Sequence, residues 1–115
     1  MVKGHIGVMS EPIEICLSHE TDYIRINLIK EGGRIVDFQV VYYTVIGGKN
    51  HQVVRYDCCH GYPHRDSLYT NPPKKEELPK RPLNELVKDA VYEIKGGWET
   101  YKRKYMRLEG KHAEE

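Results

Sequence analysis

Apolar and polar residues alternate over 13–18 and again over 24–28. This period of two is typical of strands that bury one face. The stretch 20–22 is short enough to join them as a hairpin turn. Gly-Gly pairs inside 31–34 and 47–50 predict two more tight turns, because glycine tolerates the positive φ that such turns require.

Three further strands are expected after the first Gly-Gly turn. The stretch 34–46 is rich in β-branched and aromatic residues and predicts a long strand; 51–59 predicts the next one and 64–70 a short fifth. Because short turns link successive strands, the pattern favours an antiparallel meander of four to five strands.

The pattern changes after residue 70. The stretch 71–82 holds four prolines among charged residues, which predicts a stiff connector. From Leu83 to Leu108, apolar residues recur at steps of three and four, so a helix over 83–110 is expected, with Pro82 just before its start. Gly96-Gly97 favours a kink or a break in it, with close approach of another backbone as the other interpretation.

These elements predict one α+β domain over residues 1–115. Its sheet spans 1–70, its connector 71–82, and its helix 83–110 packs on one face of the sheet. A chain of this length can bury a core without disulfides or metal. Alternation over 53–58 divides that strand into two faces: Val54, Tyr56 and Cys58 toward the helix, and Val53, Arg55 and Asp57 toward the open face.

The composition argues against a membrane-spanning protein. The 115 residues carry a formal net charge of +1 and have a mean hydropathy of −0.67. The longest apolar run, 40–46, is far shorter than the roughly 20 residues that cross a bilayer. An odd set of three cysteines and no apolar leader predict a cytoplasmic protein, without membrane partners.

Reactive side chains are densest in 55–66, which runs from a predicted strand into a Gly-Tyr-Pro turn. These residue types suit a ribonuclease that needs no metal, since histidine exchanges protons near neutral pH and arginine binds phosphate. The predicted catalytic residues are His60, His64 and Asp57, with the aspartate orienting a histidine. The predicted substrate-binding residues are Arg55 and Arg65 for phosphate, and Tyr56 and Tyr62 for stacking on bases.

A metal site is the rival interpretation of the same segment. Asp57, Cys58, Cys59, His60 and His64 all bear ligand atoms. Their spacing fits no recognised zinc pattern, because adjacent cysteines lack the two-residue gap and no second pair follows. We therefore expect no metal and no other cofactor, and we expect the cysteines to be buried as small apolar groups.

The order Arg55-Tyr56-Asp57, then His60, then Pro63-His64, resembles a pattern in the TumE-type toxins of prokaryotic toxin–antitoxin operons. The resemblance implies a toxin that acts on RNA and is paired with a small helix-turn-helix antitoxin. Asp66 stands where these toxins often have another histidine, which leaves His60 and His64 with carboxylate partners.

Two other functions remain open on the sequence. The open face of the sheet could hold RNA or a protein without catalysis. It could equally join two copies into a homodimer through some of the nine tyrosines, whose rings suit half-wet interfaces.

Overall fold

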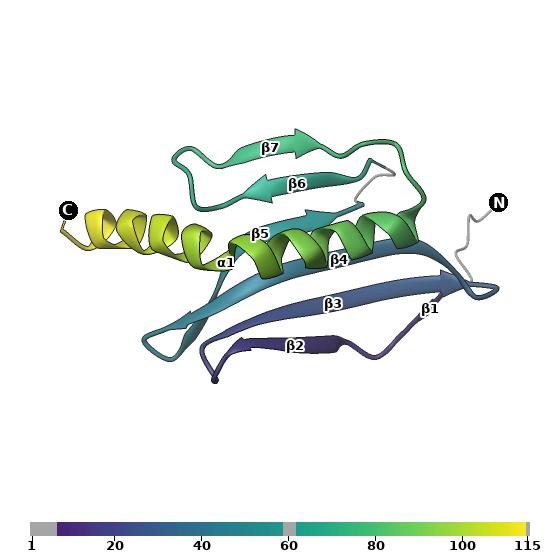
Figure 1. Cartoon of the computed structure of the whole chain (residues 1–115), viewed down its shortest axis with the longest axis horizontal. Helices are drawn as coiled ribbons and strands as arrows, with labels where there is room; N and C mark the ends of the chain where they lie inside the picture. The colour runs from purple at the N-terminus through teal and green to yellow at the C-terminus, as the bar shows by residue number, and fades with distance from the viewer. Residues whose placement is uncertain (1–6, 59–61, 115) are drawn as a thin grey trace.

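Seven strands and one helix make up the fold, seen in a computed structural model that describes residues 7–58 and 62–114 (Figure 1). The predicted α+β class is confirmed: a single antiparallel sheet carries one C-terminal helix on one face. The elements are β1 (Val8–Met9), β2 (Ile13–Ser18), β3 (Asp22–Glu31), β4 (Arg34–Ile46), β5 (Lys49–Asp57), β6 (His64–Ser67), β7 (Lys74–Glu77) and α1 (Leu83–Glu114).

The sheet follows chain order from β3 to β7, as the predicted meander requires. β1 and β2 both pair with β3, on the side away from β4, so together they form one interrupted edge. The strands number seven rather than four or five. One of the extra two, β7, lies inside the predicted connector, because its prolines flank Lys74–Glu77 and leave that stretch free to pair with β6.

The core lies between α1 and the sheet face that it covers (Figure 1). Leu86, Ala90 and Ile94 are buried at steps of four, which is the stripe that the sequence predicts. They pack with inward-facing side chains of three neighbouring strands, β3, β4 and β5, and with Cys58 just after β5. The sheet contributes Ile24, Ile26, Leu28, Phe38, Val40, Tyr42, Val53, Val54, Tyr56 and Cys58 to the same buried cluster.

Val53 departs from the simple alternation. The β4–β5 register pairs Tyr42 with Val54 and then Tyr43 with Gln52, so Val53 is the unpaired residue of a bulge. It is fully buried and joins the core. The predicted placement of Val53 on the open face is therefore wrong.

The glycine pair does not end the helix, so the predicted break is wrong: α1 runs through both residues. The two positions differ sharply in their surroundings. A Cβ at Gly97 would lie 2.7 Å from the Tyr101 ring, whereas nothing lies within 4 Å of one at Gly96. Gly97 thus lets the Tyr101 ring fold back along the helix and stack on Tyr69, with ring centroids 5.0 Å apart.

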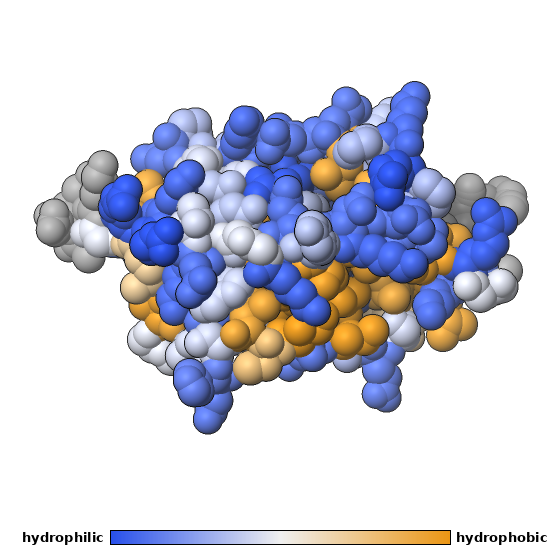
Figure 2. Space-filling view, viewed as in Figure 1, coloured by the Kyte–Doolittle hydropathy of each residue, from blue (hydrophilic) through white to orange (hydrophobic). Residues whose placement is uncertain are grey.

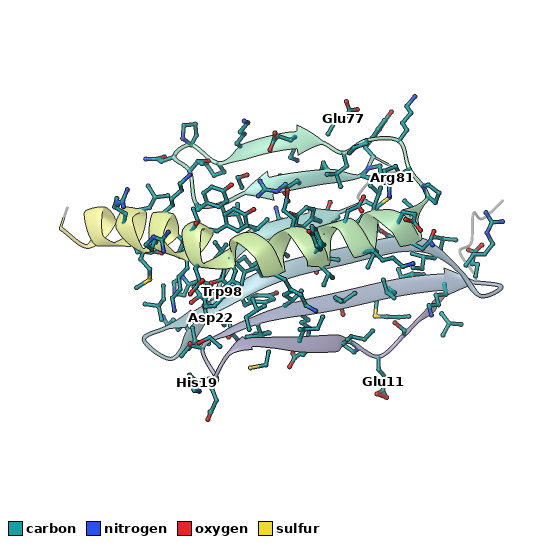
Figure 3. All side chains as sticks on the ribbon, viewed as in Figure 1. Glu11, His19, Asp22, Glu77, Arg81 and Trp98 are labelled. Carbon is teal, nitrogen blue, oxygen red and sulfur yellow. The ribbon has the colours of Figure 1, made fainter. Side chains whose placement is uncertain are left out.

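A buried carboxylate anchors the C-terminal half of α1 to the sheet. Asp22 is 1% exposed and accepts hydrogen bonds from Tyr42 Oη at 2.7 Å and Lys102 Nζ at 3.0 Å. Trp98 packs edge-on against the Tyr42 ring, and Figure 3 shows Asp22 and Trp98 at the same end of the sheet. These contacts tie α1 to β3 and β4.

Apolar side chains also reach the surface beside α1, over β3 and β2 (Figure 2). The edge formed by β1 and β2 exposes Val8, Met9 and Ile13. These residues lie at the edge of the sheet and not on its open face. The predicted homodimer through the open face therefore stays a prediction. Within the described chain, no helix combines the length and the apolar character needed to cross a membrane.

Candidate functional site

Two neighbouring strands bring four ionisable side chains together on the face of the sheet opposite α1. β5 and β6 pair Arg55 with Asp66 and Asp57 with His64. Because side chains alternate along a strand, all four project from the same face, and Tyr56 between them projects toward the helix. We call Arg55, Asp57, His64 and Asp66 the open-face cluster.

His64 lies at the centre of this cluster. Its Nε2 is 2.9 Å from Asp57 Oδ1 and 3.6 Å from Asp66 Oδ2. Its Nδ1 is 3.0 Å from the main-chain oxygen of Tyr62. Both ring nitrogens thus face acceptors. Asp57 and the Tyr62 carbonyl together fix the plane of the imidazole.

Arg55 closes the other side of the cluster. Its Nε and Nη2 donate to Asp66 Oδ2 at 3.1 and 2.8 Å, and its Nη1 donates to Gln52 at 3.1 Å. Asp57 Oδ2 lies 3.6 Å from Nε. The Arg55 side chain is one-third exposed, against 6% for Asp66. One N–H on each terminal nitrogen remains available to an incoming anion.

The same carboxylates and imidazole form a donor set for a divalent cation. One ligand atom each from Asp57, His64 and Asp66 lies within 4.8 Å of the others. The Tyr62 carbonyl on Nδ1 is the kind of second contact that orients a metal-binding histidine. A proton on Nε2 and a metal would therefore compete for one position.

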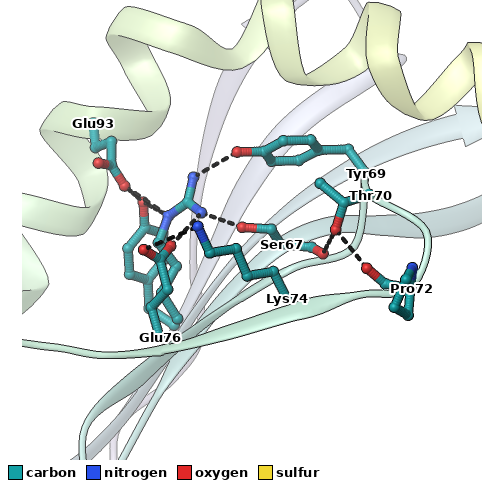
Figure 4. A network of polar contacts seen from close by, with 9 residues as sticks. Ser67, Tyr69, Thr70, Pro72, Lys74, Glu76 and Glu93 are labelled. Atoms are coloured by element: carbon teal, nitrogen blue, oxygen red, sulfur yellow. Dashed lines mark hydrogen bonds and ion pairs between the residues drawn. The ribbon is translucent and has the colours of Figure 1, made fainter.

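Arg65 and Tyr56 are not brought to this cluster, although the sequence grouped them with it. Arg65 follows His64 directly, so its side chain projects to the helix-covered face, where it is 8% exposed. Its Nε donates to Tyr56 Oη at 3.1 Å and to Glu93 Oε1 at 2.9 Å. Figure 4 shows these contacts, together with hydrogen bonds from Arg65 to Ser67 and Tyr69.

The guanidinium of Arg65 also lies over three tyrosine rings, those of Tyr56, Tyr69 and Tyr101, at 5.4 to 5.8 Å from their centroids. Burial raises the pKa of Glu93, its ion-pair partner. Burial also opposes ionisation of Tyr69, but the hydrogen bond from Arg65 and nearby charges outweigh it and lower the pKa of that phenol. Arg65 thus joins β6 to α1, and its donors are engaged there.

Two other predicted residues, Tyr62 and His60, come between β5 and β6 in the sequence. The Tyr62 side chain is 66% exposed, and its main chain supports His64. His60, like Cys59, falls outside the described residues. Cys58 is buried in the core, as expected for a small apolar group, but Cys16 is exposed, so the expectation is wrong for Cys16.

The comparisons with known proteins identify a family. A family model described as a domain of unknown function, DUF7718, matches residues 9–111. The chain belongs to the DUF7718 family. No curated protein and no solved structure matches it. The family description names no activity, so the resemblance to TumE-type toxins stays a prediction.

In this DUF7718 chain the sequence reasoning missed a depression of about 500 Å³ beside the open-face cluster. Asn27, Gln39, Asp57 and His64 form one row of register partners across β3, β4, β5 and β6. Alternation alone places Asn27 on the polar face, but only the strand register shows that it shares a row with His64. The lining residues are Met9, Asn27, Ile29, Asp37, Phe38, Gln39 and Asp57.

Proposed function

We propose that this protein is a toxin-like ribonuclease that cleaves RNA at the open-face cluster without a metal. The contact between Asp57 and His64, beside a partly exposed Arg55, is the observation that carries this proposal. A hydrogen-bonded carboxylate and imidazole can accept a proton as one unit. An adjacent guanidinium can bind the phosphate on which negative charge develops.

In the proposed reaction each predicted residue has one role, and that of His60, which falls outside the described residues, rests on the sequence alone. The Asp57–His64 pair takes the proton of a ribose 2′-OH as its oxygen attacks the neighbouring phosphorus. The bond from phosphorus to the 5′-oxygen breaks, and His60 gives that oxygen a proton. The products are a 2′,3′-cyclic phosphate and a free 5′-OH. Arg55, held in plane by Asp66, binds the non-bridging phosphate oxygens.

Purified protein with a fluorescent single-stranded RNA in excess EDTA tests the proposal. We expect cleavage to a cyclic phosphate, and a loss of at least about 100-fold in kcat for His64→Asn. His19→Asn is the matched control, because His19 is exposed and asparagine tolerates its positive φ of 42°. Equal cleavage by His64→Asn and the parent would overturn the assignment.

The toxin role has a separate test. We expect expression of the parent to arrest growth and His64→Asn not to do so. Where a small helix-turn-helix protein is encoded next to this one, its co-expression should restore growth. Binding of RNA with no turnover by the parent would instead favour a non-catalytic binding module.

A further inference from the structure

The depression beside the open-face cluster holds two amide side chains that no described residue partners. Asn27 and Gln39 are half-buried register partners on β3 and β4. Neither makes a side-chain hydrogen bond to any described residue. Their polar atoms are not among the buried side-chain atoms that lack a partner, so they reach solvent and can hydrogen-bond a ligand that enters the depression.

The apolar surface and the volume around these amides suit a flat ring. Met9 from β1 and Ile29 from β3 supply apolar surface, and the volume of about 500 Å³ holds a ring system with its sugar. Asp37, paired with Ile29 across the strands, adds a carboxylate at the rim. One of its oxygens accepts the Phe38 N–H at 2.8 Å, which holds the carboxylate in place.

The position of the depression ties it to the cluster. Gln39 is the register partner of Asp57, which is in turn the partner of His64. Adjacent strands lie about 4.8 Å apart. A ring above Gln39 thus lies one strand from Asp57, a distance that one nucleotide spans between its base and its phosphate.

We propose that this depression is a nucleobase subsite, in which Asn27 and Gln39 read the edge of the base beside the scissile phosphate. The choice of RNA as ligand rests on the proposed function. Amide groups pair with bases that present a donor next to an acceptor. The Asp37 carboxylate only accepts hydrogen bonds, so it favours bases with an exocyclic amino group. Adenine, cytosine and guanine bear one, whereas uracil presents its single donor, N3–H, between two carbonyl oxygens that the carboxylate repels.

Calorimetric titration of the full chain with 3′-AMP, 3′-CMP, 3′-UMP and inorganic phosphate tests this subsite without any cleavage. We expect 3′-AMP and 3′-CMP to bind at least about tenfold more tightly than 3′-UMP, and phosphate alone most weakly. Gln39→Met keeps the side-chain length and removes the amide, and Asn27→Leu does the same at the partner position. Each should weaken 3′-AMP binding about tenfold and leave phosphate binding unchanged.

Two controls separate this inference from the proposed function. Asn50→Ala removes an exposed amide on the same sheet and should change nothing. Arg55→Met should weaken every phosphate-bearing probe alike and keep their order. Equal affinity for 3′-AMP and 3′-UMP, or full affinity in a folded Gln39→Met protein, overturns the subsite even if RNA is cut. The expected nucleotide order without RNA cleavage overturns the ribonuclease and keeps the subsite.

Discussion

His64 and Arg65 are neighbours in the chain, yet their side chains lie on opposite faces of the sheet. His64 contacts Asp57 on the open face, and Arg65 contacts Glu93 of α1 on the other. A stretch that reads as one reactive segment therefore serves two purposes. One face offers chemistry to a substrate, and the other joins the helix to the sheet.

This division predicts different consequences for the two arginines. Arg65→Met should lower the free energy of unfolding by about 2 to 3 kcal/mol, because it leaves buried hydroxyls and Glu93 without their donor. Arg55 is more exposed, and His64 Nε2 remains 3.6 Å from the buried Asp66 carboxylate, so the loss of Arg55 should cost only about 1 kcal/mol. Urea denaturation of both variants measures the difference. A larger stability loss for Arg55→Met would contradict this division.

The effect on RNA affinity should be the reverse of the effect on stability: larger for Arg55→Met than for Arg65→Met. Arg55→Met should weaken binding to single-stranded RNA and reduce its dependence on salt, since a phosphate contact is lost. Folded Arg65→Met should bind RNA like the parent. The salt dependence of affinity, measured by fluorescence anisotropy, separates the two.

Much of this architecture could be predicted from local pattern. The alternation over 13–18 and 24–28, the Gly-Gly turns and the apolar stripe from Leu83 correctly indicated strands, turns and helix. β7 could not be predicted in this way, because Lys74–Glu77 bears only charged side chains and its pairing depends on a neighbour, β6. Edge strands of this kind leave little hydrophobic signal.

The site was only partly predictable for a similar reason. Arg55, Asp57 and His64 were found by residue type, and the structure brings them together. Applying alternation through 64–67 would have separated Arg65 from His64. Asp66, Asn27 and Gln39 needed the register between strands, which depends on turns and a bulge that residue types do not specify.

The two helix glycines give a stability prediction with an internal control. Gly96→Ala should raise the free energy of unfolding by about 1 kcal/mol, because its Cβ meets open space and alanine favours the helix. Gly97→Ala should gain less or lose stability, since its Cβ would lie 2.7 Å from the Tyr101 ring. Thermal unfolding of the two variants side by side measures this contrast. Equal stabilisation would show that the Tyr101 ring moves away at no cost.

Asp22 gives the fold a dependence on pH. Burial alone would raise the pKa of Asp22, but hydrogen bonds from Tyr42, Lys102 and Thr21 together outweigh it and lower that pKa below 3.8. The ionised carboxylate therefore stabilises the folded state fully above the ordinary value. This contribution is lost as the pH falls through the lower pKa of the folded state.

Replacing that carboxylate should remove this part of the pH dependence. Asp22→Asn should lower the free energy of unfolding by about 1 to 2 kcal/mol at pH 7, where the lost charge weakens the contact with Lys102. The deficit should shrink as the pH falls below 3.8, because the parent then loses the same charge. Urea denaturation from pH 7 to pH 2 follows both proteins. If the difference in the free energy of unfolding between the two proteins stays constant over this range, the charge of Asp22 does not contribute to stability.

The donor set at the open-face cluster predicts inhibition by metal. In the proposed reaction the Asp57–His64 pair must exchange a proton, and a cation bound by Asp57, His64 and Asp66 would take that position. We therefore expect EDTA to leave the cleavage rate unchanged and micromolar Zn²⁺ to lower it. Asp66→Asn should weaken the inhibition about tenfold, because zinc prefers a charged carboxylate to an amide. Loss of cleavage in EDTA, with recovery on adding the cation back, would show instead that the cluster is a metal-dependent centre.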